Sequence, residues 1–108
     1  MRPDHVNILG KTYSIEYKEN ASEVDIHKRE SLWGQIDYWT SSIRIYDSEG
    51  SGEQEVWDSI IHECLHGILQ QTDLQREIKN KGLDEEHLVK LLTCGLVDML
   101  FRNKWIKE

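Results

Sequence analysis

The sequence lacks the features that would place the protein in a membrane or on nucleic acid. No apolar run approaches the roughly 18 residues that a membrane-spanning helix needs. There is no cluster of five or more basic residues and the formal net charge is -7, so we expect neither nucleic acid nor an anionic membrane as the main partner. The first residues hold no hydrophobic segment of the signal-peptide kind, which predicts a cytoplasmic protein.

Cysteine is also scarce, and nothing divides the chain into parts. The two cysteines are Cys64 and Cys94, which we expect to be reduced thiols packed in the interior. The 108 residues contain 38% hydrophobic and 31% charged residues, a composition ordinary for globular proteins. No repeat, low-complexity tract or linker is present, so we expect a single domain over residues 1–108 with one modest core.

The most informative motif present is His62-Glu63-Cys64-Leu65-His66, which has the form HExxH. On a helix, residues four apart project from one face, about one turn apart along the axis. Two imidazoles in that arrangement can hold one Zn²⁺, and the glutamate can take a proton from a metal-bound water. Cys64 offers a soft ligand too, but the spacing points it toward the apolar side of the helix.

The residues around the motif predict that helix. Ser51 and Gln54 have the spacing of a capping box at a helix start. Apolar residues then form one stripe at helical spacing: Trp57, Ile60, Ile61, Cys64, Leu65, Ile68 and Leu69. At about 100° per residue, the histidines fall beside this stripe and Glu63 falls further toward the open side. We therefore expect the histidines on the floor of a cleft; the alternative is two incidental surface histidines on an amphipathic helix.

The chain before the motif predicts strands. Alternating apolar residues predict one hairpin within residues 6–17 and a second from residues 34–38 and 43–46. Residues 18–31 are weakly patterned and predict a loop with room for one helical turn. Because residues 43–46 run into the motif helix through a short loop, we expect them to form an edge strand along which an extended peptide can pair. The alternative is an interior strand, paired on both sides.

After the motif, the sequence predicts an irregular connector over residues 74–82 and then a long helix that begins after Asp84 as its N-cap. The apolar residues of that helix recur at helical spacing: Leu88, Leu91, Leu92, Gly95, Leu96, Met99 and Leu100. The order of elements predicts an α+β fold, with N-terminal antiparallel β-hairpins followed by the HExxH helix and a long C-terminal helix.

A catalytic zinc ion usually takes three protein ligands and keeps one position open, so two histidines are not enough. Candidates for the third ligand cluster at the start of the last helix. Glu85 projects into the middle of its apolar arc, Glu86 projects to the edge of the arc, and His87 points away. The first turn of a helix also favours carboxylates through the helix dipole, so charge compensation explains the cluster about equally well.

Several segments resemble a known family. They are Gly34-Gln35-Ile36-Asp37-Tyr38, Ile43-Arg44-Ile45, residues 60–69 around the motif, and Glu86-His87-Leu88-Val89 with residues 92–100. They resemble the small HExxH metallopeptidases of phages and prophages, relatives of the ImmA/IrrE-type zincins. The resemblance implies a zincin-like domain with a gluzincin-like site of His62, His66 and Glu86. Larger relatives carry Ala-Asn or Ala-Asp after the glutamate stretch where this chain has Leu88-Val89-Lys90, so Glu85 stays the alternative third ligand.

The sequence therefore predicts a zinc-dependent metallopeptidase that hydrolyses a peptide bond. Zinc would activate a water, Glu63 would accept its proton as general base, and the proton would pass to the leaving amine. The expected partner is a peptide or protein substrate, with a phage or host regulatory protein as a further candidate.

The sequence leaves the roles of several supporting residues open. No motif fixes an oxyanion-stabilising residue; Tyr38, Tyr46 and His87 are candidates by chemistry only, and strand packing is the commoner role of such tyrosines. Asp58 and Asp73 lie about one turn before and after the motif and can orient a histidine. Ordinary helix-surface charge is the commoner explanation for both.

Two other functions fit these residues less well. A small zinc ribonuclease would require a third histidine where Thr72 stands, and the acidic chain repels RNA. A non-catalytic zinc-containing phage regulatory or binding protein would have a closed coordination shell and no use for Glu63. The four tryptophans (Trp33, Trp39, Trp57 and Trp105) can form a partner surface, although we expect them to fill a small core.

Overall fold

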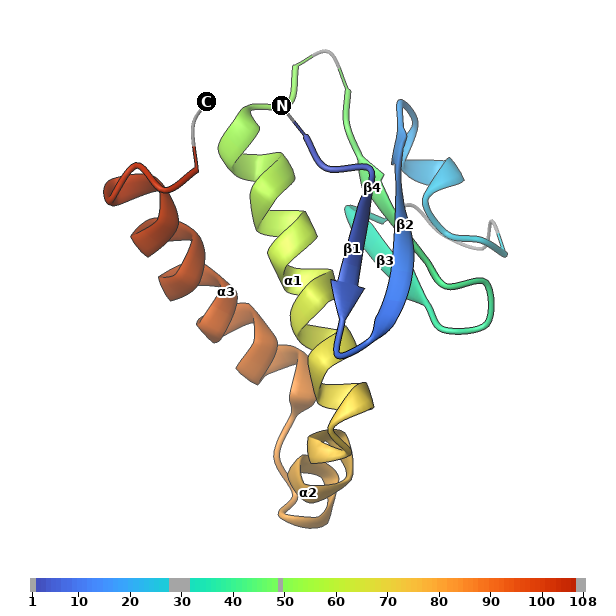
Figure 1. Ribbon diagram of the computed structural model, residues 1–108, viewed down its shortest axis with the longest axis vertical. Helices are drawn as coiled ribbons and strands as arrows, with labels where there is room; N and C mark the ends of the chain where they lie inside the picture. The colour runs from blue at the N-terminus through green and yellow to red at the C-terminus, as the bar shows by residue number, and fades with distance from the viewer. Residues whose placement is uncertain (1, 28–31, 49, 107–108) are drawn as a thin grey trace.

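The computed structural model describes residues 2–27, 32–48 and 50–106, in which a small sheet is followed by helices (Figure 1). The elements in chain order are β1 (His5–Ile8), β2 (Lys11–Lys18), a 3-10 turn (Ala21–Glu23), β3 (Gly34–Asp37), β4 (Ser42–Tyr46), α1 (Glu53–Gln71), α2 (Leu74–Asn80) and α3 (Glu85–Arg102). This order confirms the predicted α+β class. Among the described residues, no helix combines the length and apolar character needed to cross a membrane.

The sheet has the strand order β1-β2-β4-β3. Both predicted hairpins are confirmed, since β1 pairs antiparallel with β2 and β3 pairs antiparallel with β4. The two hairpins join through β2 and β4, which run parallel with Ile15 beside Ile43. The predicted antiparallel pairing therefore holds within each hairpin but not between the hairpins, because β3 takes the far edge and β4 returns between β3 and β2. The expected edge strand at residues 43–46 is therefore an interior strand, and β3 is the edge.

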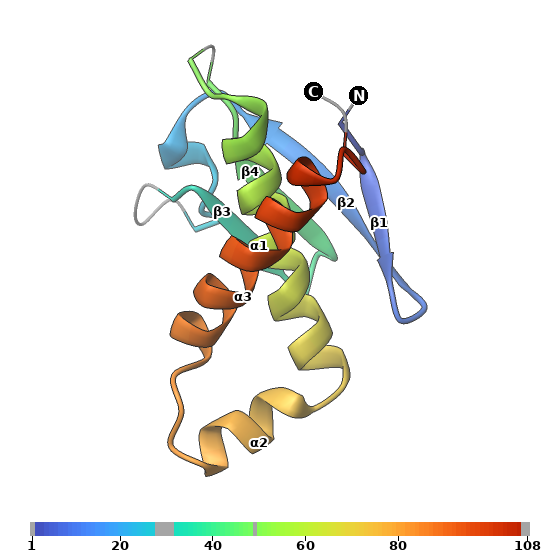
Figure 2. The same cartoon turned by 90° about the vertical axis from the view of Figure 1, so that its left-hand side faces the viewer.

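The molecule has three layers: the sheet, α1 and α3. Figure 1 shows α1 between the sheet and α3, and Figure 2, turned by 90°, shows α3 in front with α1 and the sheet behind it. The main core lies between the sheet and α1 and consists of Ile8, Tyr13, Ile15, Ile43, Ile45, Val56 and Ile60. A smaller cluster of Leu69, Ile78 and Val89 joins α1, α2 and α3 at the lower end of Figure 1.

Because α1 is covered on two sides, its buried residues differ from the predicted stripe. Ile68, expected in the stripe, is 41% exposed, whereas Glu63, expected toward the open side, is only 8% exposed. A glycine brings α1 close to the sheet: a Cβ added at Gly67 would lie 2.8 Å from Cδ1 of Ile8 and 3.1 Å from Cδ1 of Ile36. The polar face of α1 beside Glu63 thus lies under β3 rather than in open solvent.

The sequence predicted the N-cap of α3 correctly but not that of α1. Asp84 is the N-cap of α3, as predicted, and its side chain accepts hydrogen bonds from the backbone N–H groups of Glu86 and His87. The capping box predicted for α1 is wrong: the N-cap is Gly52, without a side-chain hydrogen bond, and the Ser51 hydroxyl pairs with Ser48 instead. The start of α3, which carries the candidate ligands, is therefore the better fixed of the two.

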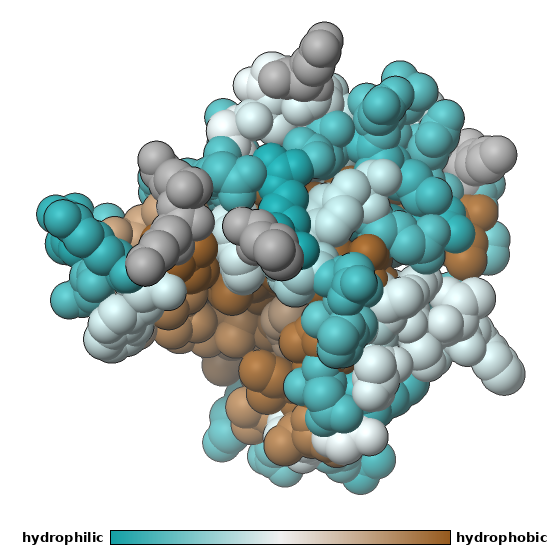
Figure 3. All heavy atoms as spheres, turned by 45° about the horizontal axis from the view of Figure 1, so that its top comes forward, coloured by the Kyte–Doolittle hydropathy of each residue, from teal (hydrophilic) through white to brown (hydrophobic). Residues whose placement is uncertain are grey.

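Two further predictions about the C-terminal half need correction. The connector over residues 74–82 contains a helix, α2, held by the burial of Ile78. In α3 the residues that pack inward are Val89, Thr93 and Val97, while Leu91, Leu92 and Met99 of the predicted stripe are exposed. Apolar side chains also gather in a hollowed area on the face shown in Figure 3.

The expected core positions of the tryptophans and cysteines are likewise only partly met. Trp33, Trp39 and Trp105 are exposed, and only Trp57 packs against the main core. Cys94 is exposed, while Cys64 packs against the main core.

Candidate metal centre

Residues from α1 and α3 meet at one point of the structure. His62 and His66 lie one turn apart on α1, and the first turn of α3, fixed by the Asp84 cap, faces them with Glu85 and Glu86. The cluster of Leu69, Ile78 and Val89 holds the two helices together just beyond this point. The local sequence therefore places two imidazoles and two carboxylates at the contact between the helices.

Glu86 bridges the two histidines. Its Oε1 lies 2.6 Å from Nε2 of His62, and its Oε2 lies 2.9 Å from Nε2 of His66. One ligand atom from each of the three residues falls within 4.8 Å of the others. Two imidazole nitrogens and one carboxylate oxygen form a donor set that zinc accepts. The three side chains thus converge on one point, where they could hold a single metal ion.

Glu85 contacts the other side of the same imidazole. Its Oε2 lies 2.5 Å from Nδ1 of His66, and its side chain is 21% exposed, compared with 64% for Glu86. A carboxylate on the distal ring nitrogen fixes the tautomer and the ring orientation of a metal-binding histidine. Of the two glutamates that the sequence left open, the structure brings Glu86 to the ligand group and places Glu85 behind His66.

Glu63 lies under the edge strand. A Cβ added at Gly34 of β3 would lie 3.1 Å from Oε2 of Glu63, so the glycine lets the strand and the carboxylate approach closely. Burial raises the pKa of Glu63 to about 7, and the Glu86 carboxylate adds to the rise. His66 and the backbone N–H of Ile36 act in the opposite direction. The Glu63 carboxylate is thus enclosed beside the two histidines.

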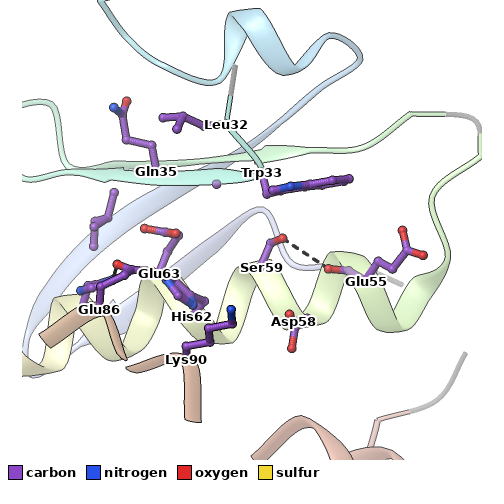
Figure 4. Close-up of a pocket in the computed structure, with 13 residues that line it drawn as sticks. Leu32, Trp33, Gln35, Glu55, Asp58, Ser59, His62, Glu63, Glu86 and Lys90 are labelled. Atoms are coloured by element: carbon purple, nitrogen blue, oxygen red, sulfur yellow. Dashed lines mark hydrogen bonds and ion pairs between the residues drawn. The ribbon is translucent and has the colours of Figure 1, made fainter. Parts of the chain in front are cut away.

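These residues line a cavity of about 800 Å³ between β3 and α1 (Figure 4). Its lining residues are Leu32 and Trp33 just before β3, Gly34, Gln35 and Ile36 in β3, Glu55, Asp58, Ser59, His62, Glu63 and His66 along α1, and Glu86 and Lys90 from α3. Figure 4 shows Glu63 pointing up from α1 toward β3, with the Trp33 ring above Ser59 further along the cavity. The candidate ligands therefore open onto a groove bounded by a sheet edge.

The tyrosine and histidine candidates for an oxyanion-stabilising residue do not line this cavity. The Tyr38 hydroxyl donates a hydrogen bond to the backbone carbonyl of His66 at 3.2 Å, and burial raises the pKa of Tyr38 to about 12. Tyr46 makes an edge contact with the Trp33 ring at 5.3 Å between centroids. His87 is exposed and lies outside the lining. These positions favour structural roles for the two tyrosines.

The remaining candidates separate in the same way. Asp58 lines the cavity, whereas Asp73 pairs with Arg76 at 3.3 Å, away from the histidines. Cys64 packs against the core, where burial raises its pKa to about 11, and it is not part of the ligand group. Thr72, the position at which a ribonuclease would need its third histidine, donates its hydroxyl to the carbonyl of Ile68 instead.

Sequence reasoning missed two residues of the site. Gly34 could have been found only with the knowledge that β3 crosses over the motif. Lys90 follows Glu86 by four residues, and helical spacing alone places both on one face of α3. The position of Lys90 could therefore have been predicted from the sequence.

Comparison with protein-family models, with curated proteins and with solved structures finds no match to this chain. The function is therefore inferred from its own residues and geometry.

Proposed function

We propose that the protein is a zinc-dependent metallopeptidase, in which His62, His66 and Glu86 bind the metal and Glu63 acts as general base. The observation that carries the proposal is the meeting of these four side chains in one cavity. The three ligand atoms lie within 4.8 Å of one another, and Glu63 is buried beside them under β3. A purely structural site would have no use for an enclosed carboxylate next to its ligands.

The chain's own residues supply proton transfer and shielding. A zinc ion held by the three ligands would activate a water and polarise a carbonyl group. Glu63 would take a proton from that water as its oxygen bonds to the carbonyl carbon, and would pass the proton to the nitrogen as the C–N bond breaks. Gly34 and the packing of β3 keep the carboxylate in place and exclude bulk water from one side of it.

The edge strand β3 provides the docking surface for an extended peptide. The N–H of Tyr46 donates to the carbonyl of Trp33 at 2.9 Å. Antiparallel pairs alternate between bonded and non-bonded positions, so Gln35 bonds to β4 while the backbone groups of Gly34 and Ile36 point away from it. Both residues line the cavity. The N–H of Ile36 already bonds to Glu63, so a peptide that adds as a further strand would pair with the backbone of Gly34 and the carbonyl of Ile36. The proposed docking site is therefore β3, in place of the predicted site along residues 43–46, which form an interior strand.

Peptide hydrolysis by the zinc-loaded protein and by Glu63→Gln tests the proposal. With a mixed peptide library analysed by mass spectrometry, we expect cleavage by the wild type and a loss of several powers of ten in the variant. Zinc content and the circular dichroism spectrum should stay unchanged, because Glu63 is not a ligand. Glu77→Gln on the exposed face of α2 is the matched control and should cleave like the wild type.

Two results would overturn the catalytic assignment. Equal cleavage by Glu63→Gln and the wild type would show that the carboxylate is not the base. Stoichiometric zinc without any cleavage would favour a non-catalytic zinc-containing binding protein, the alternative function that the same ligands allow.

A further inference from the structure

Lys90 is the one lysine or arginine among the described residues that line the cavity. It lies one turn after Glu86 on α3, so the two side chains leave the same face of the helix. Figure 4 shows the Lys90 side chain extending along α1 between His62 and Asp58, as seen in this view. A positive group thus lies at the cavity beside the candidate ligands.

Among the residues that the structure describes, no ion pair holds this ammonium group. In the described part of the chain no carboxylate lies within 4 Å of it, although Glu55, Asp58 and Glu63 line the same cavity. Lysine carries three donors on a long flexible stem, so an unpaired ammonium can reach a group that enters the cavity. The polar end of Lys90 is therefore free to contact a bound substrate.

We propose that Lys90 stabilises the negative charge that forms on the substrate carbonyl oxygen during hydrolysis, an inference that rests on the metallopeptidase function proposed above. When the water oxygen bonds to the carbonyl carbon, the π electron pair of the C=O bond moves to its oxygen. When the C–N bond breaks, that pair re-forms the double bond and the nitrogen receives the proton held by Glu63. A cation at the cavity interacts more strongly with the charged oxygen than with the neutral carbonyl, which accelerates the reaction.

The other groups offered by the chemistry of the sequence are engaged elsewhere. The Tyr38 hydroxyl is bonded to the backbone of His66, and Tyr46 packs against Trp33. His87 leaves α3 outside the cavity lining. Lys90 alone among these residues both lines the cavity and keeps unused hydrogen-bond donors.

The test compares wild type, Lys90→Met, Lys90→Arg and the control Lys79→Met, which removes an exposed lysine of α2. Methionine keeps much of the stem and removes the charge. In zinc-loaded protein we expect Lys90→Met to lower kcat on an amidated peptide by about 10²- to 10³-fold with little change in KM. Lys90→Arg should recover part of the loss, and all variants should keep equimolar zinc and the wild-type melting temperature.

A second readout does not depend on turnover. A phosphinic peptide, whose anionic phosphinate replaces the scissile amide, should bind Lys90→Met about 10- to 100-fold more weakly than the wild type. The dissociation constant of the matching amide, measured in the Glu63→Gln background so that it is not cleaved, should change little on Lys90→Met. Intrinsic fluorescence can follow both titrations, because Trp33 lines the cavity.

The outcomes separate this inference from the function on which it rests. An unchanged kcat and an unchanged phosphinate affinity in Lys90→Met would overturn the role of Lys90. The metallopeptidase proposal would still stand if hydrolysis needs zinc and Glu63. An effect on KM alone would overturn the role of Lys90 too and would assign Lys90 to substrate binding. If Lys90→Met loses zinc or unfolds, and a second neutral variant, Lys90→Gln, does the same, Lys90 instead balances charge in the folded protein. Failure of the wild type to bind zinc, or cleavage that is independent of Glu63, would overturn the metallopeptidase proposal itself.

Discussion

At the scale of single residues, the site depends on two adjacent glutamates that contact different nitrogens of one imidazole. Glu86 approaches Nε2 of His66 at 2.9 Å, and Glu85 approaches Nδ1 at 2.5 Å. The Asp84 cap fixes the backbone from which both side chains leave. The chain thus uses consecutive positions for one candidate ligand and for the group that orients another.

This division predicts unequal effects on metal affinity. Glu86→Ala should lose zinc binding almost completely, whereas Glu85→Gln should weaken it about 10- to 100-fold, because it removes only the charge behind His66. Competition titration with a chromophoric zinc chelator measures both, with Glu77→Gln as control. If Glu85→Ala abolishes binding and Glu86→Ala leaves it intact, the assignment of the third ligand is wrong.

Gly34 gives a second prediction at this scale. In Gly34→Ala the new Cβ would lie 3.1 Å from Oε2 of Glu63 and would displace the carboxylate by a few tenths of an ångström. We expect equimolar zinc, an unchanged fold and a decrease in kcat of about tenfold or more, since small misplacements of a catalytic group are costly. Gly50→Ala, where an added Cβ meets nothing within 4 Å, should be silent. Wild-type kcat in Gly34→Ala would argue against Glu63 as the base.

At the scale of elements, local patterns predicted the hairpins and both long helices, but not the faces that these helices bury. Alternation marked β1 to β4 because it is a property of each strand alone. The neighbours of α1 and α3 come from distant parts of the chain, so Glu63 and Leu91 lie on sides opposite to those predicted. The parallel pairing of β2 with β4 likewise depends on where the chain crosses over.

The same distinction applies to the candidate site. The residue types and the spacing of His62, Glu63 and His66 predicted a metal site, and the structure brings both histidines together with a glutamate. The choice between Glu85 and Glu86 needed the packing of α3 on α1, which no local pattern contains. The use of β3 rather than β4 as the exposed edge needed the strand order, because both strands have similar alternation.

The edge role of β3 predicts a pattern of amide protection. In zinc-loaded protein the N–H of Gly34 should exchange faster than that of Gln35, which bonds to β4. Binding of a phosphinic peptide should slow exchange at Gly34 by at least about tenfold and leave the outer edge of β1, at Asn7, unchanged. Hydrogen exchange followed by NMR checks this. No change at Gly34 with the peptide bound would exclude strand addition at β3.

At the scale of the whole molecule, the cavity forms where three layers meet. β3 belongs to the sheet, the histidines to the middle layer, and Glu86 to the outer helix, which the cluster of Leu69, Ile78 and Val89 holds against α1. A metal ion at this point would connect α1 to α3. The three ligands come together only in the folded state. Metal binding and folding stability should therefore be coupled.

This coupling predicts a metal-dependent melting temperature. Zinc at about 100 times its dissociation constant should stabilise the folded state by about 2.7 kcal/mol. For a domain of this size that stabilisation corresponds to an increase in Tm on the order of 10 °C. Chelation by EDTA should reverse the increase, and His66→Ala should show none. A wild-type Tm that does not respond to zinc would mean that the ligands do not act together in the folded chain.

X-ray absorption at the zinc edge tests the central claim most directly, because it reports the ligands themselves. We predict one zinc per chain, with two imidazole nitrogens at about 2.0–2.1 Å and carboxylate or water oxygens completing the shell. Glu63→Gln should leave the spectrum unchanged, because Glu63 is not one of the proposed ligands. A sulfur ligand at about 2.3 Å, which would come from Cys64 or Cys94, or a shell without imidazole would contradict the proposed centre.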